Sequence, residues 1–507
     1  MIMRKINFLL LLLLSAVCVQ MQAQERYLDE VFTDVQVTTG ITYGVNASIL
    51  AYQVFGEAIP ENLLMDIYEP VGDTETSRPL VIYCHSGNFL PFPDNGTSNG
   101  TRQDCTIVDI CKRLARMGYV AASIDYRLGW NPVAPTQDER VNTLINAAYR
   151  GVQDARTAVR YFRKDAAENG NTYGIDPNKT VIWGQGTGGY ISFAVTTLDD
   201  YQEVLLPKFT TVDGGGNPIP MVIEQINGDI YGTSVGVNPL DGDTLCYPNH
   251  VGYNSDFQMG LNMGGALGDS SWAEDSNTPF VSFHTVDDQF APYANGIVIV
   301  PLPGNPLPVL EVQGSYIVQR VLNRVGANDI FLSAGINDVY TTKANSMNDG
   351  SEGLYPMKTA EASDSGPWDW WDPTTNPNHS NAIQGNPDMS QAKATAYMDT
   401  IFGYFAPRAC AALSLSCSTV GLEDLEEDLV ELSVAPNPAK DVIALKTSGQ
   451  YPIEDIYVYD MSGRLVKAHV KVNSNYFRVE RNNLPSGMYM MQLRFKDGQI
   501  SKRVMFE

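Results

Sequence analysis

Short apolar runs rich in β-branched and aromatic residues alternate along the chain with longer segments of helical periodicity. The runs predict β-strands at residues 63–68, 80–84, 120–126, 180–184, 280–288 and 329–335. Apolar residues recur at helical spacing in residues 105–119, 145–170, 314–326 and 390–413. Strands and helices in this rhythm form a parallel sheet with helices on both faces. The pattern therefore predicts an α/β domain with a mostly parallel sheet flanked by helices.

Residues 340–377 show little regular patterning, but they hold three of the six tryptophans of the chain, Trp368, Trp370 and Trp371. Long loops in compact domains are usually functional lids or disordered segments. The tryptophans favour an ordered lid. Its aromatic side chains either stack on a substrate ring or pack within the lid, and we keep all three as candidate substrate-binding residues.

The pattern changes again near the C-terminus. Residues 416–430 form an acidic stretch without clear periodicity, which is typical of a solvated linker. Residues 431–507 alternate short β-patterned runs with turn signals. This part predicts a small all-β sandwich, and residues 24–415 remain for the α/β domain.

Composition narrows the class of partner. The chain of 507 residues carries a formal net charge of −24 and is 44% hydrophobic. Nucleic acid or an anionic membrane as partner would require a basic face, so the charge excludes both. Residues 1–23 combine a short basic start, an apolar run and a small-residue cleavage site, which predicts a secretory signal peptide. No later stretch is apolar over the roughly 20 residues of a membrane span.

Six cysteines remain after removal of the signal peptide, an even number that indicates disulfides in an exported chain. Six cysteines allow 15 pairings. Two pairs are close enough in sequence to close local loops: Cys410 with Cys417, and Cys105 with Cys111. No cysteines and histidines have zinc-site spacing, and nothing in the pattern points to a cofactor or a metal.

The C-terminal module resembles a known export signal. "APNPAKD" at 435–441, "VYDMSGRLV" at 458–466, "LPSGMYMMQL" at 484–493 and the closing "KRVMF" occur in this order. They are similar to the type A sorting domain of the type IX secretion system of Bacteroidetes. The resemblance implies export through the periplasm and outer membrane by that machinery, to the cell surface or the medium.

Residues 43–413 resemble the α/β-hydrolase fold, nearest to secreted carboxylesterases of the type B and hormone-sensitive-lipase kind. Four motifs in order carry the resemblance: "CHSGNF" at 84–89, "DYRLG" at 125–129, "YGIDPNKTVIWGQGTGGY" at 173–190 and "FHTVDDQFAPY" at 283–293. The family places an oxyanion loop at the first, the nucleophile elbow at the third and the catalytic acid at the fourth. Fold alone does not establish activity.

The elbow departs from the family at its central residue. In G-x-S-x-G the serine occupies a strained strand-to-helix turn and points at the substrate. Here Gly184 and Gly188 match the flanking glycines, and Gly186 stands at the nucleophile position. Glycine fits the turn without steric cost and removes the chemistry. The neuroligins, non-catalytic relatives of cholinesterases, have the same exchange. The neighbouring Thr187 is a second candidate nucleophile, although the family uses this residue as a backbone oxyanion donor.

The remaining site residues follow from the family order. Asp288 falls at the position of the acid, and His379 is the better candidate for the base because it follows the last predicted strand. His379 comes more than forty residues after that strand, so either a long insertion returns it to the site or the base is also lost. The resemblance assigns the oxyanion donors to Gly87, Asn88 and Thr187, although Ser86 and Asn88 replace family glycines.

Two function classes follow, with a third as contrast. The first is an impaired esterase that binds an ester, glycan or polymer, because Gly186 lacks a hydroxyl. The second is an active ester hydrolase that uses Thr187, or a water activated by His379. A purely adhesive module is the contrast, and it predicts no pocket near Gly186.

Overall fold

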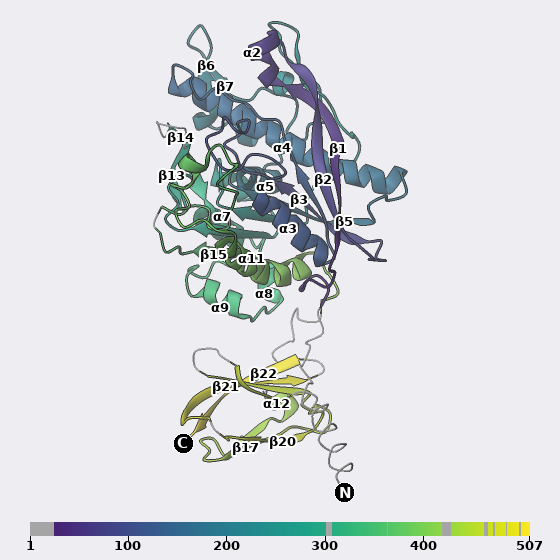
Figure 1. Cartoon of the computed structure of the whole chain (residues 1–507), viewed down its shortest axis with the longest axis vertical. Coiled ribbons are helices and arrows are strands. Elements are labelled where there is room, and N and C mark those ends of the chain that lie inside the picture. Colours follow the sequence, from purple (N-terminus) through teal and green to yellow (C-terminus); the bar gives the residue numbers. More distant parts are fainter. Residues whose placement is uncertain are drawn as a thin grey trace.

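The computed structural model describes residues 25–300, 307–361, 363–417, 427–460, 465–469, 472–482, 484–495 and 498–507. The predicted signal peptide, and residues 418–426 of the predicted acidic linker, lie outside these ranges. An α/β part comes first in the chain, and a part made almost entirely of β-strands follows it (Figure 1).

Eight strands form the large sheet of the α/β part, in the order β1-β2-β4-β3-β5-β10-β12-β15. In that order their bounds are Val35–Ser48, Ile59–Pro70, Val120–Ile124, Arg78–Cys84, Ile175–Gln185, Met259–Met263, Phe280–Thr285 and Leu354–Met357. Neighbouring strands from β4 to β15 are parallel, whereas β2 is antiparallel to both β1 and β4. This mostly parallel sheet confirms the predicted α/β-hydrolase fold.

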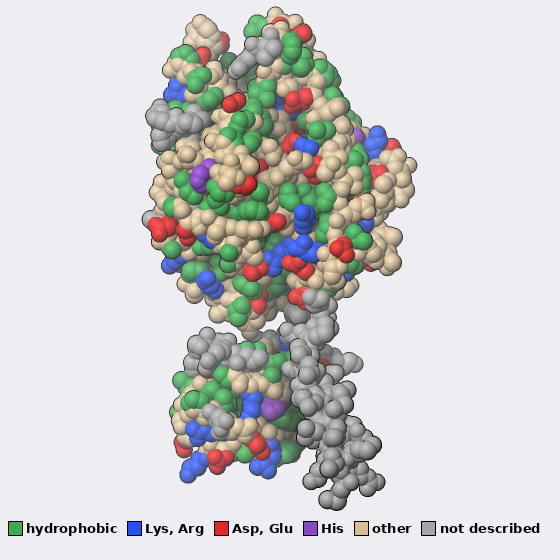
Figure 2. All heavy atoms as spheres, viewed as in Figure 1, with side chains coloured by type: hydrophobic (Ala, Val, Ile, Leu, Met, Phe, Trp, Pro, Cys, Tyr) green, Lys and Arg blue, Asp and Glu red, His purple; other side chains and the backbone are tan. Residues whose placement is uncertain are grey.

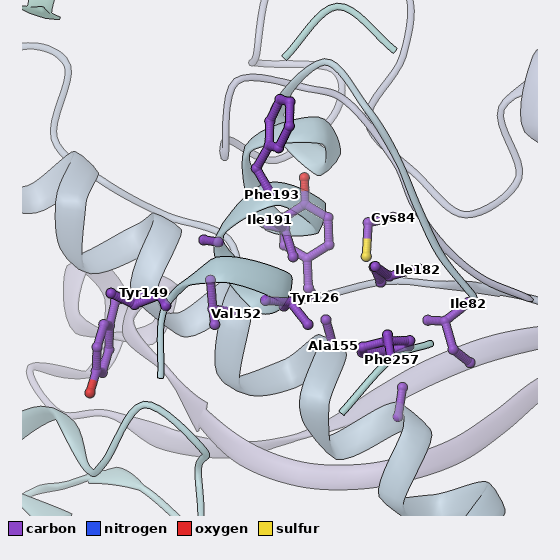
Figure 3. Packing of buried hydrophobic residues seen from close by; sticks show 14 of the residues in the cluster. Ile82, Cys84, Tyr126, Tyr149, Val152, Ala155, Ile182, Ile191, Phe193 and Phe257 are labelled. Carbon is purple, nitrogen blue, oxygen red and sulfur yellow. The ribbon is translucent and has the colours of Figure 1, made fainter. Parts of the chain in front are cut away.

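Helices cover both faces of this sheet. On one face lie α4 (Gln137–Glu168), α5 (Thr187–Thr197) and α7 (Ser315–Arg324), and on the other lie α3 (Cys105–Arg116) and α11 (Gln391–Ala412). Ile82 and Ile182 face the first set, whereas Val81 and Val181 face the second. Figure 3 shows the first of these layers in close-up. Burial on both faces explains why β3 is apolar without alternation.

Two predictions about elements were wrong. Residues 329–335 contain the short helix α8 (Asp329–Ser333) and not a strand. The last strand of the sheet is β15, which lies within the stretch predicted to be irregular, together with the helix α9 (Val339–Asn345). Short apolar runs do not distinguish a strand from a buried helical turn, and the proline in "LYPM" argues against a strand.

Shorter elements fill the connections of the α/β part. Three strands form a separate small sheet, β11 (Ala266–Leu267), β14 (Leu307–Gly314) and β13 (Asn295–Val300). Two two-stranded ribbons pair β6 (Thr210–Val212) with β7 (Pro218–Pro220) and β8 (Gly236–Val237) with β9 (Thr244–Cys246). Three short helices are α2 (Tyr52–Phe55), α6 (Glu224–Asn227) and α10 (His379–Ala382). The four 3₁₀ helices are Ile49–Ala51, Tyr201–Val204, Pro207–Phe209 and Ser270–Ala273 within the described residues.

One of the two local cysteine pairs is bonded. Cys410 and Cys417 form a disulfide with Cα atoms 6.1 Å apart. The other local pair considered from the sequence, Cys105 with Cys111, does not form, because both thiols are free. Both residues lie in α3, where six positions along a helix separate them by about 9 Å of rise, beyond the reach of a disulfide.

The C-terminal part is a sandwich of two antiparallel sheets, as predicted. One sheet has the order β16-β17-β20 and the other β19-β18-β21-β22. The bounds, in chain order from β16 to β22, are Ser433–Ala435, Val442–Lys446, Asp455–Asp460, Leu465–His469, Tyr476–Glu480, Gly487–Phe495 and Gly498–Phe506, and the short helix α12 (Glu427–Val430) precedes them. Leu445 and Val479 of the first sheet share a core with Val458 and Met491 of the second.

Candidate functional site

The turn between β5 and α5 has the backbone of a nucleophile elbow. Gly186 adopts φ 52° and ψ −115°, a conformation that side chains with a Cβ rarely adopt. The flanking glycines allow the strand and helix to approach closely: a Cβ on Gly184 would lie 1.9 Å from the carbonyl oxygen of Gly188, and a Cβ on Gly188 would lie 2.0 Å from that of Cys84. The elbow is therefore built as in an esterase, without a hydroxyl at its tip.

The side chain of Ser86 fills the space next to Gly186. A Cβ atom on Gly186 would lie 2.1 Å from Oγ of Ser86 and 2.9 Å from its Cβ. Contacts below 3.0 Å between such atoms require one of them to move. Ser86 thus lies beside Gly186, at the position where the G-x-S-x-G motif has its serine.

The hydroxyl of Thr187 is already engaged. Its Oγ1 lies 3.1 Å from the phenol oxygen of Tyr126, and that phenol donates to the carbonyl oxygen of His85 at 2.8 Å. With the phenol proton committed to this carbonyl, the Thr187 hydroxyl is the donor to Tyr126. Burial raises the pKa of Tyr126 well above its usual value, so Tyr126 remains a neutral acceptor and a poor base for Thr187.

The oxyanion loop keeps free backbone donors. Gly87 and Asn88 have φ values of 116° and 58°. The carbonyl oxygens of Gly87, Asn88 and Phe89 accept hydrogen bonds from Leu90 N, Trp130 Nε1 and Gly129 N. Among the described residues the N–H groups of Gly87, Asn88 and Thr187 have no acceptor. Asn88 and Thr187 line the cavity and are available to a ligand oxygen, whereas Gly87 does not line it.

Asp288 lies just after β12, at the family position of the acid. Its Oδ1 accepts the amides of Phe290 at 2.8 Å and Ala291 at 3.1 Å. Its Oδ2 lies 3.6 Å from Nε2 of His284, a contact that sequence reasoning missed although four positions separate the two residues. His284 is fully buried and its Nδ1 lies 2.8 Å from the Ser315 hydroxyl, so this imidazole has a packed, internal position.

The structure does not bring His379 to the elbow. Its Nδ1 accepts a hydrogen bond from Trp371 Nε1 at 3.1 Å at the start of α10. All five histidines of the chain lie within the described residues, and none of them lines the cavity that contains Gly186. The site therefore combines an acid with an elbow, and no imidazole lines the cavity around Gly186.

The three tryptophans belong to an ordered segment, as predicted, but they do not act together. Trp368 and Trp371 are buried and line the cavity. Trp370 does not line it, because its Nε1 donates to Asp109 of α3 at 2.9 Å. The candidate substrate-binding role of Trp370 is therefore corrected: this side chain fixes the segment to α3.

A cavity of about 280 Å³ joins these parts. Ser86, Asn88, Gly186, Thr187 and Asp288 contribute to its wall. Most of the remaining wall is apolar, and α4, α5, β13 and β14 contribute part of it. Within the described ranges, no three His, Cys, Asp or Glu side chains are grouped so that they could hold a metal ion.

A second carboxylate of the cavity wall, Asp369, was not identified from the sequence. Gln185, the residue before Gly186, donates from Nε2 to its Oδ1 at 2.5 Å. Burial raises the pKa of Asp369 to about 7. The hydrogen bond between Gln185 and Asp369 thus joins the tryptophan segment to the elbow, and its acceptor is a carboxyl group with a pKa near neutral pH.

We expect Asp369 to make the folded state less stable as the pH rises from about 4 to about 7. In this window the folded protein keeps a proton on Asp369 that the unfolded chain has lost, so the free energy of unfolding falls with pH. Asp369→Asn should raise that free energy by about 1–3 kcal/mol at pH 8 and flatten its pH dependence. Thermal unfolding between pH 4 and 8 measures both effects.

Asp372→Asn in the same segment is the matched control. Hydrogen bonds from Thr374 lower the pKa of Asp372, so this carboxylate stabilises the fold above its pKa and its replacement should not raise stability at pH 8. Equal pH profiles for wild type and Asp369→Asn would contradict the assignment.

Comparison with protein families gives one match for each part of the chain. Residues 433–507 match the model of the secretion system C-terminal sorting domain, and residues 65–213 match the BD-FAE model. The chain has an esterase-like α/β-hydrolase fold and a type IX secretion sorting domain. The sorting domain directs export to the cell surface or the medium. No helix in the described part of the chain has the length and apolar content of a membrane span.

Individual relatives of the α/β-hydrolase part are esterases. Esterase-5C of Drosophila persimilis and that of Drosophila pseudoobscura pseudoobscura are each 25% identical over 179 residues, which is 34% of this chain. The match spans 28% of the length of these relatives.

Solved structures give a weaker likeness. Esterase B from Lactobacillus rhamnosis, inhibited by a tributyrin phosphonate, is 12% identical with a TM-score of 0.32, over 76% of this chain and 91% of that one. The propionate-bound esterase of Thermogutta terrifontis is 14% identical with a TM-score of 0.31, over 73% and 95%. The fold assignment rests on the sheet order.

The surface agrees with an exported acidic protein. Asp and Glu side chains are interspersed with Lys and Arg over the face shown in Figure 2, without a broad basic area on that face. The sorting domain implies interaction with the type IX secretion machinery.

Proposed function

We infer that the protein is an exported ligand-binding protein that has the fold of an esterase but no nucleophile at its elbow. The observation that carries this proposal is the elbow conformation of Gly186 with no hydroxyl on the residue. Ester hydrolysis by this fold needs a nucleophile and a histidine that takes its proton. Neither group is found at the tip of this elbow.

The alternative is an active carboxylic ester hydrolase that uses Thr187 or a water activated by His379. Two contacts weigh against it. The Thr187 hydroxyl is held by Tyr126, and His379 is held by Trp371 outside the cavity wall. A displacement of about 1 Å from the productive geometry already costs about 10²-fold in rate.

A cavity that includes Gly186 favours a ligand-binding role over a purely adhesive module, which would have no pocket there. Among ester, glycan and polymer ligands, the apolar wall favours an ester with an aliphatic arm. Burial of an aliphatic arm contributes about 0.8 kcal/mol for each CH₂ group.

Hydrolysis of p-nitrophenyl butyrate tests the proposal. We expect the mature protein without the sorting domain to show at most residual turnover, since oxyanion donors and binding alone give about 10³–10⁴-fold over water. Thr187→Val and His379→Ala should leave that rate unchanged within about twofold, because neither side chain reacts. Ready turnover that either substitution abolishes would establish the hydrolase instead.

A further inference from the structure

The hydroxyl of Ser86 occupies the space where a side chain on Gly186 would begin. It is 2.1 Å from the place of a Cβ on Gly186, and Ser86 lines the cavity. No described residue forms a hydrogen bond with this hydroxyl. A serine hydroxyl is therefore presented to the cavity from the oxyanion loop and not from the elbow.

Several other donors of the cavity wall also lack acceptors within the described ranges. The N–H groups of Asn88 and Thr187 are unpaired, and that of Thr187 belongs to the first turn of α5, where the helix dipole favours negative charge. The phenol oxygen of Tyr190 is buried in the cavity wall without a partner. A buried donor without an acceptor destabilises the folded protein, so these donors favour the binding of a ligand that has an acceptor oxygen.

The charge of the wall restricts that ligand. Asp288 and Asp369 line the cavity, and the described wall contains no Lys, Arg or His. A free carboxylate or phosphate would face two acidic side chains without a counter-charge. An uncharged carbonyl accepts from the unpaired donors without this repulsion, and the apolar wall formed by α4, α5 and β14 suits an aliphatic chain.

We propose that Ser86 replaces the lost elbow hydroxyl as a binding group, and that it donates a hydrogen bond to the carbonyl oxygen of an uncharged aliphatic carboxylic ester. No bond to the ester carbon forms, because no imidazole in the cavity wall accepts the Ser86 proton. This inference rests on the proposed ligand-binding function and names the residue that selects the ester group.

Two probes of equal length test the contact. Methyl octanoate contains the carbonyl, and methyl octyl ether has a CH₂ group in its place. Titration of the full mature chain, followed by the fluorescence of the cavity tryptophans, gives the dissociation constant of each. Ser86→Ala should weaken binding of the ester about 3- to 10-fold and leave binding of the ether unchanged within about twofold. Ser380→Ala, an exposed serine of α10, should change neither.

Moving the hydroxyl from position 86 to position 186 tests whether ester binding can be restored. Ser86→Gly should weaken ester binding as Ser86→Ala does. Ser86→Gly combined with Gly186→Ser returns a hydroxyl to the same space and should restore ester affinity to within about threefold of wild type. Circular dichroism checks that each variant is folded.

The outcomes separate the two proposals. If both probes bind and the Ser86 variants affect them equally, the carbonyl contact is wrong while ligand binding stands. If neither probe binds wild type at its solubility limit, both proposals fail. If octanoate binds more tightly than its methyl ester, the preference for an uncharged ester is overturned.

Discussion

Gly186→Ser alone is expected to destabilise the α/β-hydrolase part by about 2–4 kcal/mol. The new Cβ would lie 2.9 Å from Cβ of Ser86, and rotation of the Ser86 hydroxyl does not relieve this contact. Overpacking in a closed site costs about 1–3 kcal/mol, and a positive φ on a residue with a side chain adds about 1–2 kcal/mol. Urea unfolding of the two proteins measures the difference.

Ser86→Gly should rescue this variant. With the Ser86 side chain removed, only the backbone cost remains, so the double variant should recover about 1–3 kcal/mol. Gly335→Ser is the backbone control, because Gly335 has φ 58° and nothing within 4 Å of its added Cβ. Equal losses for Gly186→Ser and Gly335→Ser, with no rescue by Ser86→Gly, would contradict the close contact between residues 86 and 186.

The double variant should still not become an efficient esterase. It places a serine on the elbow, but no histidine lines the cavity to take the serine proton. Turnover of p-nitrophenyl butyrate should therefore stay within about tenfold of wild type. A gain of more than 10³-fold would show that an imidazole reaches the site after all.

Arg127→Met is the second large effect, with an expected loss of about 3–5 kcal/mol. Arg127 and Asp154 are both buried, and Nη2 of Arg127 lies 2.9 Å from Oδ1 of Asp154. The guanidinium also donates to Asn46, Gln153 and the Leu245 carbonyl. Removal of the cation leaves the Asp154 carboxylate in the interior with a single backbone donor, the Arg127 N–H.

This pair also supports the site, since it fixes the end of β4 next to Tyr126, which holds Thr187. The free energy of unfolding in urea at pH 7 measures the loss. Arg324→Met, which removes an exposed pair with Glu274, should cost no more than about 1 kcal/mol. A similarly small loss for Arg127→Met would show that the buried pair contributes little.

Much of the fold could be predicted from local patterns because each pattern has a local physical cause. The strand predicted at residues 80–84 is β3, and its core residues are apolar because helices cover both faces of the sheet. The helix α3 ends just before Gly118, which adopts φ 101°. The strand β15 was missed because its local pattern does not indicate a strand. Its four residues contain a proline, and only the parallel pairing with β12 makes them a strand.

The absence of a hydroxyl at position 186 was also determined by the sequence alone. A glycine at position 186, between glycines that allow close packing, can form the turn and cannot supply a nucleophile. Local spacing was sufficient here because the turn is built from consecutive residues. The same holds for the sorting domain, whose motifs follow one another along a single short module.

The tertiary structure alone decided which side chains meet this turn. Ser86 and Gly186 are separated by a hundred positions, and they come together because β3 and β5 are neighbours in the sheet. Asp369 reaches Gln185 through a segment without regular structure, and His379 stays outside the cavity in the same region. Contacts between loops depend on the packing of the whole domain, so no local pattern of residues could specify them.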